Sequence, residues 1–87
     1  MTKYKEETQI TIEVAAQQTG LHPRIVRRCI RWGLVGESLT ETELSELRRI
    51  RRLSSLGINF AGIDVILRMR RRIQALQAEI ERLETNR

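Results

Sequence analysis

The sequence predicts an all-α protein, in which a small helical domain is followed by a C-terminal coiled-coil helix. Three observations support this fold class. Start and stop signals divide the chain into four helical segments, one segment carries arginines at helical spacing, and the last carries an apolar heptad. The expected organisation is a flexible arm over residues 1–9, a helical domain over 10–58, and a helix with a dimerisation segment over 59–87.

Two of the expected helices begin at recognisable caps. Thr11 can accept a hydrogen bond from the first turn of a helix over 12–19, and the glycine after this helix supplies a left-handed stop. Thr40 and Glu43 form a capping box, in which the threonine hydroxyl binds one free amide and the glutamate reaches back to another. A third helix is therefore expected over 41–56. Its predicted core residues are Leu44, Leu47, Ile50 and Leu53.

The second helix carries a row of positive charge. Pro23 suits a first helical position, His22 is a weak candidate cap, and the helix is expected over 23–32, ending at the following glycine. Residues at i, i+3, i+4 and i+7 share one face, and here they are Arg24, Arg27, Arg28 and Arg31. The apolar residues, Cys29 and Trp32 among them, fall on the other side. A merely solvated face more often mixes signs, so this face predicts an anionic partner.

The last helix is expected to begin after the cap Asn59 and to run from residue 60 to the C-terminus, with 67–72 as the place for a kink or break. Its apolar stripe has alternating spacings of three and four: Ile66, Met69, Ile73, Leu76, Ile80 and Leu83. The first turns of this helix, with Ile63, Ile66 and Leu67, are expected to pack on the protein's own helices. Beyond Ile73 no other element is long enough to cover the stripe, which predicts a coiled-coil homodimer.

Charges along the coil favour an antiparallel pair. A parallel pair would place Glu79 of one chain opposite Glu84 of the other, which is repulsive. Antiparallel pairing instead brings Arg70 or Arg72 toward these glutamates, and each attraction is worth about a few tenths of a kcal/mol.

Composition agrees with an anionic partner. The chain has 87 residues, a net charge of +5, and fourteen arginines against two lysines. Arginine suits phosphate because its planar fork donates two parallel hydrogen bonds. Nucleic acid is therefore the leading class of partner. A heat-loving source or a high-GC genome would also enrich arginine, and a basic protein can bind acidic proteins.

Other classes of function are disfavoured. Aromatic residues are too scarce for base stacking, and one histidine with one cysteine cannot make a metal site. No nucleophile is paired with a base, so no enzyme is expected. No cofactor is expected either, and no small-molecule ligand, because no sequence remains after the coil to build a pocket. Without a long apolar run or a signal peptide, the protein is expected in the cytoplasm and not in a membrane. Cys29 is predicted to be a small core residue.

The order of short motifs resembles the MerR-type family of transcriptional regulators over roughly residues 10–85. The motifs are Thr11-Ile12, Val14-Ala15-Ala16, Thr19-Gly20-Leu21, Arg27, Gly33-Leu34-Val35, Leu47-Arg48-Arg49-Ile50, and Leu56-Gly57-Ile58-Asn59-Phe60-Ala61-Gly62-Ile63. The chain is most similar to two short branches, the HspR-type heat-shock repressors and the CbpM-type chaperone modulators.

The resemblance implies a winged helix-turn-helix domain that dimerises through an antiparallel coiled coil, with the helix over 23–32 in the major groove of double-stranded DNA. The candidate DNA-binding residues are Thr11, His22, Arg24, Arg27, Arg28 and Arg31. Where the family commonly has aromatic residues that contact phosphate, this chain has Arg28 and Cys29, so that contact is lost unless Arg28 replaces it.

The family's wing is expected to be missing. A wing is a β-hairpin of about ten residues, and only the five residues over 35–39 are available between the second and third helices. Fewer phosphate contacts would weaken DNA binding and its salt dependence. The alternative implied by the resemblance is a CbpM-like modulator that binds the J-domain of a DnaJ-like co-chaperone through the same arginine face.

Overall fold

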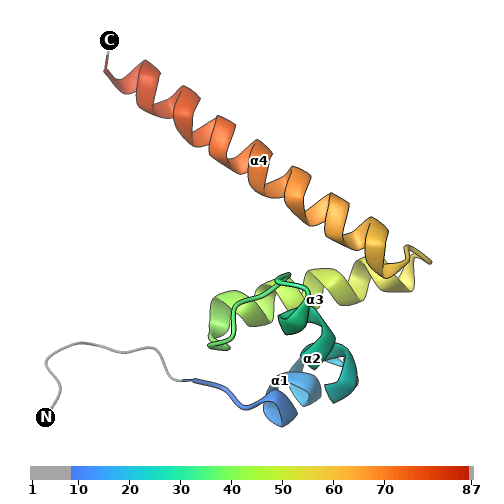
Figure 1. Cartoon of the computed structure of the whole chain (residues 1–87). Coiled ribbons are helices and arrows are strands. Elements are labelled where there is room, and N and C mark those ends of the chain that lie inside the picture. The colour runs from blue at the N-terminus through green and yellow to red at the C-terminus, as the bar shows by residue number, and fades with distance from the viewer. Residues whose placement is uncertain (1–8, 87) are drawn as a thin grey trace, which may run out of the picture. The chain divides into compact units, whose positions relative to one another are not determined.

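The computed structural model describes residues 9–86, so residues 1–8 of the expected arm lie outside the described part. This part contains four α-helices and no β-strand, which confirms the all-α prediction (Figure 1). The helices are α1 (Ile12–Thr19), α2 (Pro23–Arg31), α3 (Glu41–Ser55) and α4 (Phe60–Thr85).

The chain divides into two compact units, one ending at Gly57 and one beginning at Ile58. The first unit holds α1, α2 and α3, and α1 contacts both of the other helices (Figure 1). Ala15 and Ala16 of α1 are buried, and their small side chains allow the helices to approach closely. The second unit is α4 with the residues at its two ends.

The core of the first unit draws on all three helices and on the segment between α2 and α3. The buried residues of α2 and α3 are Val26, Cys29, Leu44, Leu47 and Ile50. Leu34, Val35 and Leu39 of the connecting segment are buried with them, which the sequence did not lead us to expect. The segment is also held by a hydrogen bond of 2.8 Å from the Ile10 amide to the Leu39 carbonyl. Leu53, predicted for the core, is only partly buried.

Three predicted helix caps are confirmed. The Val14 amide donates to Thr11 Oγ1 at 3.1 Å, the Arg24 amide donates to His22 Nδ1 at 3.0 Å, and the Gly62 amide donates to Asn59 Oδ1 at 2.8 Å. Each bond satisfies an amide that the helix itself leaves without a partner. The turns around these helices are therefore fixed largely by local interactions.

At the start of α3, Glu43 reaches back as the capping box predicts. Its Oε1 accepts from the Thr40 amide at 3.4 Å and from the Thr40 hydroxyl at 2.6 Å. The Thr40 hydroxyl bond is the main reason that the pKa of Glu43 lies below its ordinary value. The carboxylate is therefore tied to its cap in the charged form.

Two helices end one residue before the predicted position. Trp32 and Leu56, expected as the last residues of their helices, are the C-caps of α2 and α3. Each is followed by a glycine with positive φ, which turns the chain out of the helix.

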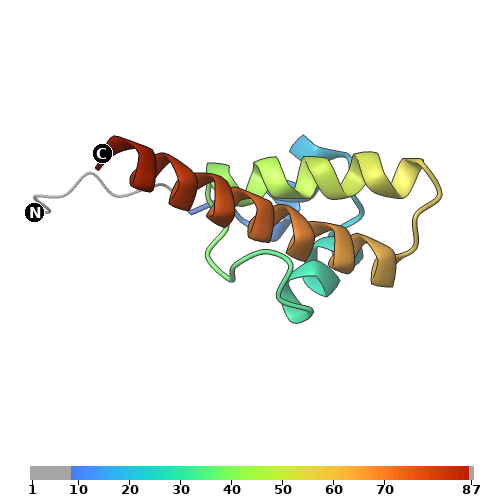
Figure 2. The ribbon, with the colours of Figure 1, turned by 90° about the horizontal axis from the view of Figure 1, so that it is seen from above.

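α4 is one uninterrupted helix of 26 residues, so the kink considered for 67–72 is absent (Figure 2). Its only glycine, Gly62, lies in the first turn, and Asp64 accepts from Arg68 Nε at 3.0 Å across one turn of the helix. Ile63 and Leu67 are buried, as predicted, and Ile66 is partly buried. No helix in the described range is both long enough and apolar enough to cross a membrane.

Candidate nucleic-acid interface

The four arginines predicted to share a face of α2 are all exposed. The opposite face of α2 is anchored because Val26 and Cys29 have no exposed surface. This burial fixes the rotation of the helix and therefore the side from which Arg24, Arg27, Arg28 and Arg31 project. The amphipathic pattern of the sequence thus gives the correct outward face.

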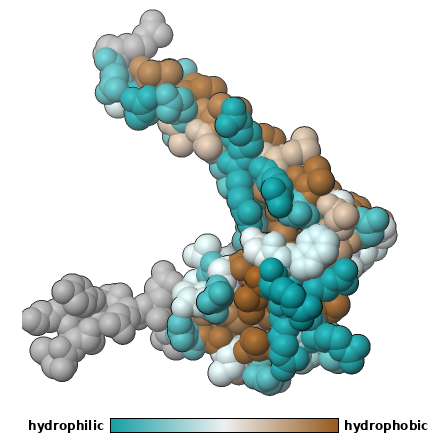
Figure 3. Space-filling model, viewed as in Figure 1, coloured by the Kyte–Doolittle hydropathy of each residue, from teal (hydrophilic) through white to brown (hydrophobic). Residues whose placement is uncertain are grey.

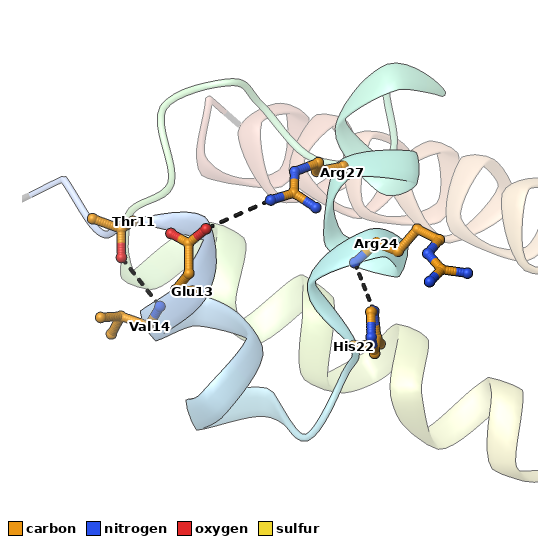
Figure 4. A network of polar contacts seen from close by, with 6 residues as sticks. All are labelled: Thr11, Glu13, Val14, His22, Arg24 and Arg27. Atoms are coloured by element: carbon orange, nitrogen blue, oxygen red, sulfur yellow. Dashed lines mark hydrogen bonds and ion pairs between the residues drawn. The ribbon is translucent and has the colours of Figure 1, made fainter.

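Arg27 is not surrounded by positive charge alone. Its Nη2 lies 3.5 Å from Glu13 Oε2, and the two side chains are 51% and 71% exposed (Figure 4). Glu13 comes from the first turn of α1, so the ion pair joins α1 to α2. The Arg27 side chain extends toward α1, whereas the Arg24 guanidinium points away from it (Figure 4).

Arg28 lies over the ring of Trp32, with Cζ 5.6 Å from the ring centroid, in a cation–π arrangement. Trp32 is 43% exposed. The prediction that Trp32 belongs to the apolar side of the helix is wrong, because Trp32, the C-cap of α2, comes four residues after Arg28 and lies on the same side as this arginine. Arg28 and Trp32 therefore form one exposed unit at the C-terminal end of α2.

A fifth guanidinium lies against the turn between α1 and α2. A Cβ placed on Gly20 would come within 2.6 Å of Arg51 Nε, so this side chain of α3 covers the glycine closely. Gly20 has a φ of 81°, a conformation that residues with a side chain rarely adopt. Because Arg51 is exposed and its guanidinium can move aside, the positive φ is the main reason for glycine at this position.

Cys29 is a buried residue of the core, as predicted. Burial raises the pKa of its thiol to about 11, against a smaller opposing effect of the Arg28 charge. The thiol is therefore protonated and shielded at neutral pH. Among residues 9–86, no group of three or more histidine, cysteine or acidic side chains is placed to hold a metal ion.

The segment between α2 and α3 contains no strand in the described structure, so no wing is formed there. Its apolar residues turn inward, since Leu34, Val35 and Leu39 are buried, while Gly36, Glu37 and Ser38 are exposed. The segment therefore contributes buried apolar side chains where the family has its wing.

The apolar stripe of α4 lies largely on the surface of the single chain. Met69, Ile73, Leu76, Ile80 and Leu83 are each about half exposed, and apolar side chains are visible along α4 in Figure 3. Glu79, expected to face a partner chain, pairs with Arg82 of its own helix. The dimer interface stays a prediction.

Two helices joined by the three residues Gly20, Leu21 and His22, with the second helix exposing a charged face, define a helix-turn-helix protein. Residues 10–85 match the model of the MerR HTH family regulatory proteins, and the chain belongs to this family. Proteins of this family are DNA-binding transcription regulators, as the resemblance in the sequence suggested.

A curated relative supports the same assignment. The chain is 36% identical over 88 aligned residues to a Streptomyces coelicolor protein that bears the name heat shock protein HspR. The alignment covers 90% of this chain but only 58% of the relative, so the chain spans little more than half of that protein. No solved structure gives a significant match.

Proposed function

We propose that the protein is a sequence-specific regulator that binds double-stranded DNA as a homodimer and places α2 in the major groove. The observation that carries this proposal is the arginine face of α2, defined as Arg24, Arg27, Arg28 and Arg31, which is exposed on a helix whose other face is buried. A helix with this orientation suits the groove because its side chains can reach base edges while the unit behind it stays rigid. Membership of the MerR family supports the same role.

Residues at the ends of α1 and α2 fit supporting roles. Thr11 and His22 use their side chains as caps, and both residues are exposed beside helix N-termini. Helix N-termini attract phosphate because their free amides and dipole favour negative charge. In this proposal Thr11 and His22 fix these ends of α1 and α2 near the DNA backbone.

Dimerisation through α4 supplies the second half of the site. A half-exposed stripe of isoleucine, leucine and methionine on a long helix loses contact with water when it pairs with a copy of itself. Two copies of the arginine face then read two half-sites, and affinity no longer depends on one wingless domain.

The test is an anisotropy titration of genomic duplex fragments with the wild type, Arg24→Ala and Arg28→Ala. Arg82→Ala is the matched control because it removes the same charge from a position off the apolar stripe of α4. We expect each α2 substitution to weaken binding to the fragment with the highest affinity by about 1–3 kcal/mol, the range for a specific arginine contact. The control should change this binding free energy little. Equal weak binding to every fragment, unchanged by the α2 substitutions, would contradict the proposal.

A CbpM-like role is the second candidate, and two observations favour it. The described part has no wing strand, and Trp32 beside Arg28 offers the exposed aromatic and arginine pair that protein interfaces often use. In this role the arginine face would bind the J-domain of a DnaJ-like co-chaperone. Retention of a J-domain at micromolar concentration, lost in Trp32→Ala, would support it, and no retention would count against it.

A further inference from the structure

We infer that Glu13 is a positioning residue that sets the sequence specificity of the arginine face by holding Arg27. This inference rests on the proposed function, because it assigns a role to Glu13 within the same DNA-binding site. It starts from the ion pair of 3.5 Å between Glu13 Oε2 and Arg27 Nη2, which crosses from α1 to α2 (Figure 4).

The ion pair does too little for stability to explain its place on the surface. Both side chains are more than half exposed, and exposed pairs contribute about 0–1 kcal/mol at most. Glu13 already has a local use in the first turn of α1, where a carboxylate interacts favourably with the helix dipole. Neither effect requires an arginine partner on α2.

The distance leaves Arg27 available for a ligand. At 3.5 Å the contact is longer than the 2.7–2.9 Å typical of a charge-assisted hydrogen bond. The guanidinium has five N–H donors in a fixed fork, and Glu13 approaches it at one nitrogen. The carboxylate therefore favours one direction of the Arg27 side chain, toward α1, and leaves its donors available.

The charge of Glu13 has opposite effects on the two kinds of DNA contact. A carboxylate beside Arg27 repels a phosphate that approaches the same guanidinium, which weakens binding to any duplex. A base edge carries no net charge, so Glu13 does not repel it. A guanidinium already held in one direction binds the base edge more tightly, because it loses less conformational freedom on binding. Glu13 thus lowers non-specific affinity more than specific affinity.

The test measures the specificity ratio, which is the affinity for a selected duplex divided by that for an unselected one. The probes are the duplex most enriched by the wild type from a randomised double-stranded library and the unselected library itself. Glu13→Gln keeps the size and helix propensity of the side chain and removes its charge. We expect Glu13→Gln to raise the affinity for the unselected library by about three- to tenfold, the order expected for one unit charge near a water-exposed surface. The affinity for the selected duplex should change less.

The matched control is Glu41→Gln. Glu41 is an exposed acid in the first turn of α3, so its substitution removes the same charge and a similar helix-dipole interaction from another helix. We expect Glu41→Gln to leave the specificity ratio close to that of the wild type. An equal loss of specificity in both variants would mean that net charge alone matters, and this result would overturn the inference.

A double-mutant cycle with Arg27→Ala shows whether Glu13 acts through Arg27. We expect the effect of Glu13→Gln on the specificity ratio to disappear in the Arg27→Ala background. Two results would overturn the inference and leave the proposed function intact. In the first, Glu13→Gln changes the specificity ratio as much in the Arg27→Ala background as in the wild type. In the second, Arg27→Ala lowers the specificity ratio but Glu13→Gln has no effect on it. If the wild type enriches no duplex at all, the proposed function fails first.

Discussion

Substitution of Gly20 tests the packing of the turn that joins α1 to α2. With φ at 81°, an alanine at this position would adopt a left-handed conformation that costs about 1–2 kcal/mol. Its Cβ would also lie 2.6 Å from Arg51 Nε, so the arginine would have to leave its position. The clash is with the far end of a flexible and exposed side chain, so Arg51 can turn into another rotamer, and we expect its movement to add at most about 0.5 kcal/mol.

Gly33→Ala is the matched control for this substitution. Gly33 has a similar φ of 75°, and a Cβ placed there would meet nothing within 4 Å. Gly33→Ala should therefore cost only the backbone strain, and Gly20→Ala should cost this strain with at most about 0.5 kcal/mol more. The difference corresponds to a few degrees in Tm for a domain of this size.

Urea denaturation at one fixed protein concentration measures the effect of both substitutions on the free energy of unfolding, because the stability of the proposed dimer would depend on concentration. Arg51→Ala removes the obstacle, so Gly20→Ala should cost no more than Gly33→Ala in that background. If Gly20→Ala costs much less than about 1 kcal/mol, or if its excess over Gly33→Ala is well above about 0.5 kcal/mol, the reasoning from backbone strain and a displaceable Arg51 is refuted.

Three further predictions concern other parts of the chain. Ile73→Asp or Leu76→Asp should give a monomer by light scattering, because a buried charge opposes coil pairing, and an unaltered mass would contradict the dimer. The pKa of Glu43 is lowered from 4.5, so the stability that this carboxylate gives the fold is complete above pH 4.5 and is lost as the pH falls through the lower native pKa. Glu43→Gln should therefore lack this part of the pH dependence of the free energy of unfolding. The Cys29 thiol, buried with a pKa of about 11, should react with a disulfide reagent at mildly alkaline pH only after denaturation, and fast labelling of the native protein would contradict its burial.

The sequence predicts the helices well because their limits depend on neighbouring residues. Thr11, His22 and Asn59 each cap a helix through an amide two or three residues away, and such bonds need no knowledge of the fold. The outward face of α2 follows from helical periodicity for the same reason, since Val26 and Cys29 of the apolar face are buried and the arginines are not.

Features that depend on tertiary contacts were not predictable in this way. Glu13 and Arg27 belong to different helices, and the packing of α1 on α2 decides whether they meet. The burial of Leu34, Val35 and Leu39 depends on tertiary contacts, although three apolar residues in a short polar connection are a signal that could have indicated it. Trp32 is a different case, because its spacing of four residues from Arg28 already places it beside the arginine face, and its assignment to the apolar side misapplied helical periodicity.

The salt dependence of DNA affinity tests the central claim most directly, which is that the arginine face of α2 binds DNA. The logarithm of the binding constant falls linearly with the logarithm of the salt concentration, with a slope of about −0.9 for each phosphate neutralised on duplex DNA. We expect the double variant Arg24→Ala/Arg28→Ala to bind DNA more weakly and with a flatter slope than the wild type. Arg82→Ala should leave both the affinity and the slope close to those of the wild type. If the double variant has the same affinity and the same slope as the wild type, the arginine face of α2 does not bind DNA.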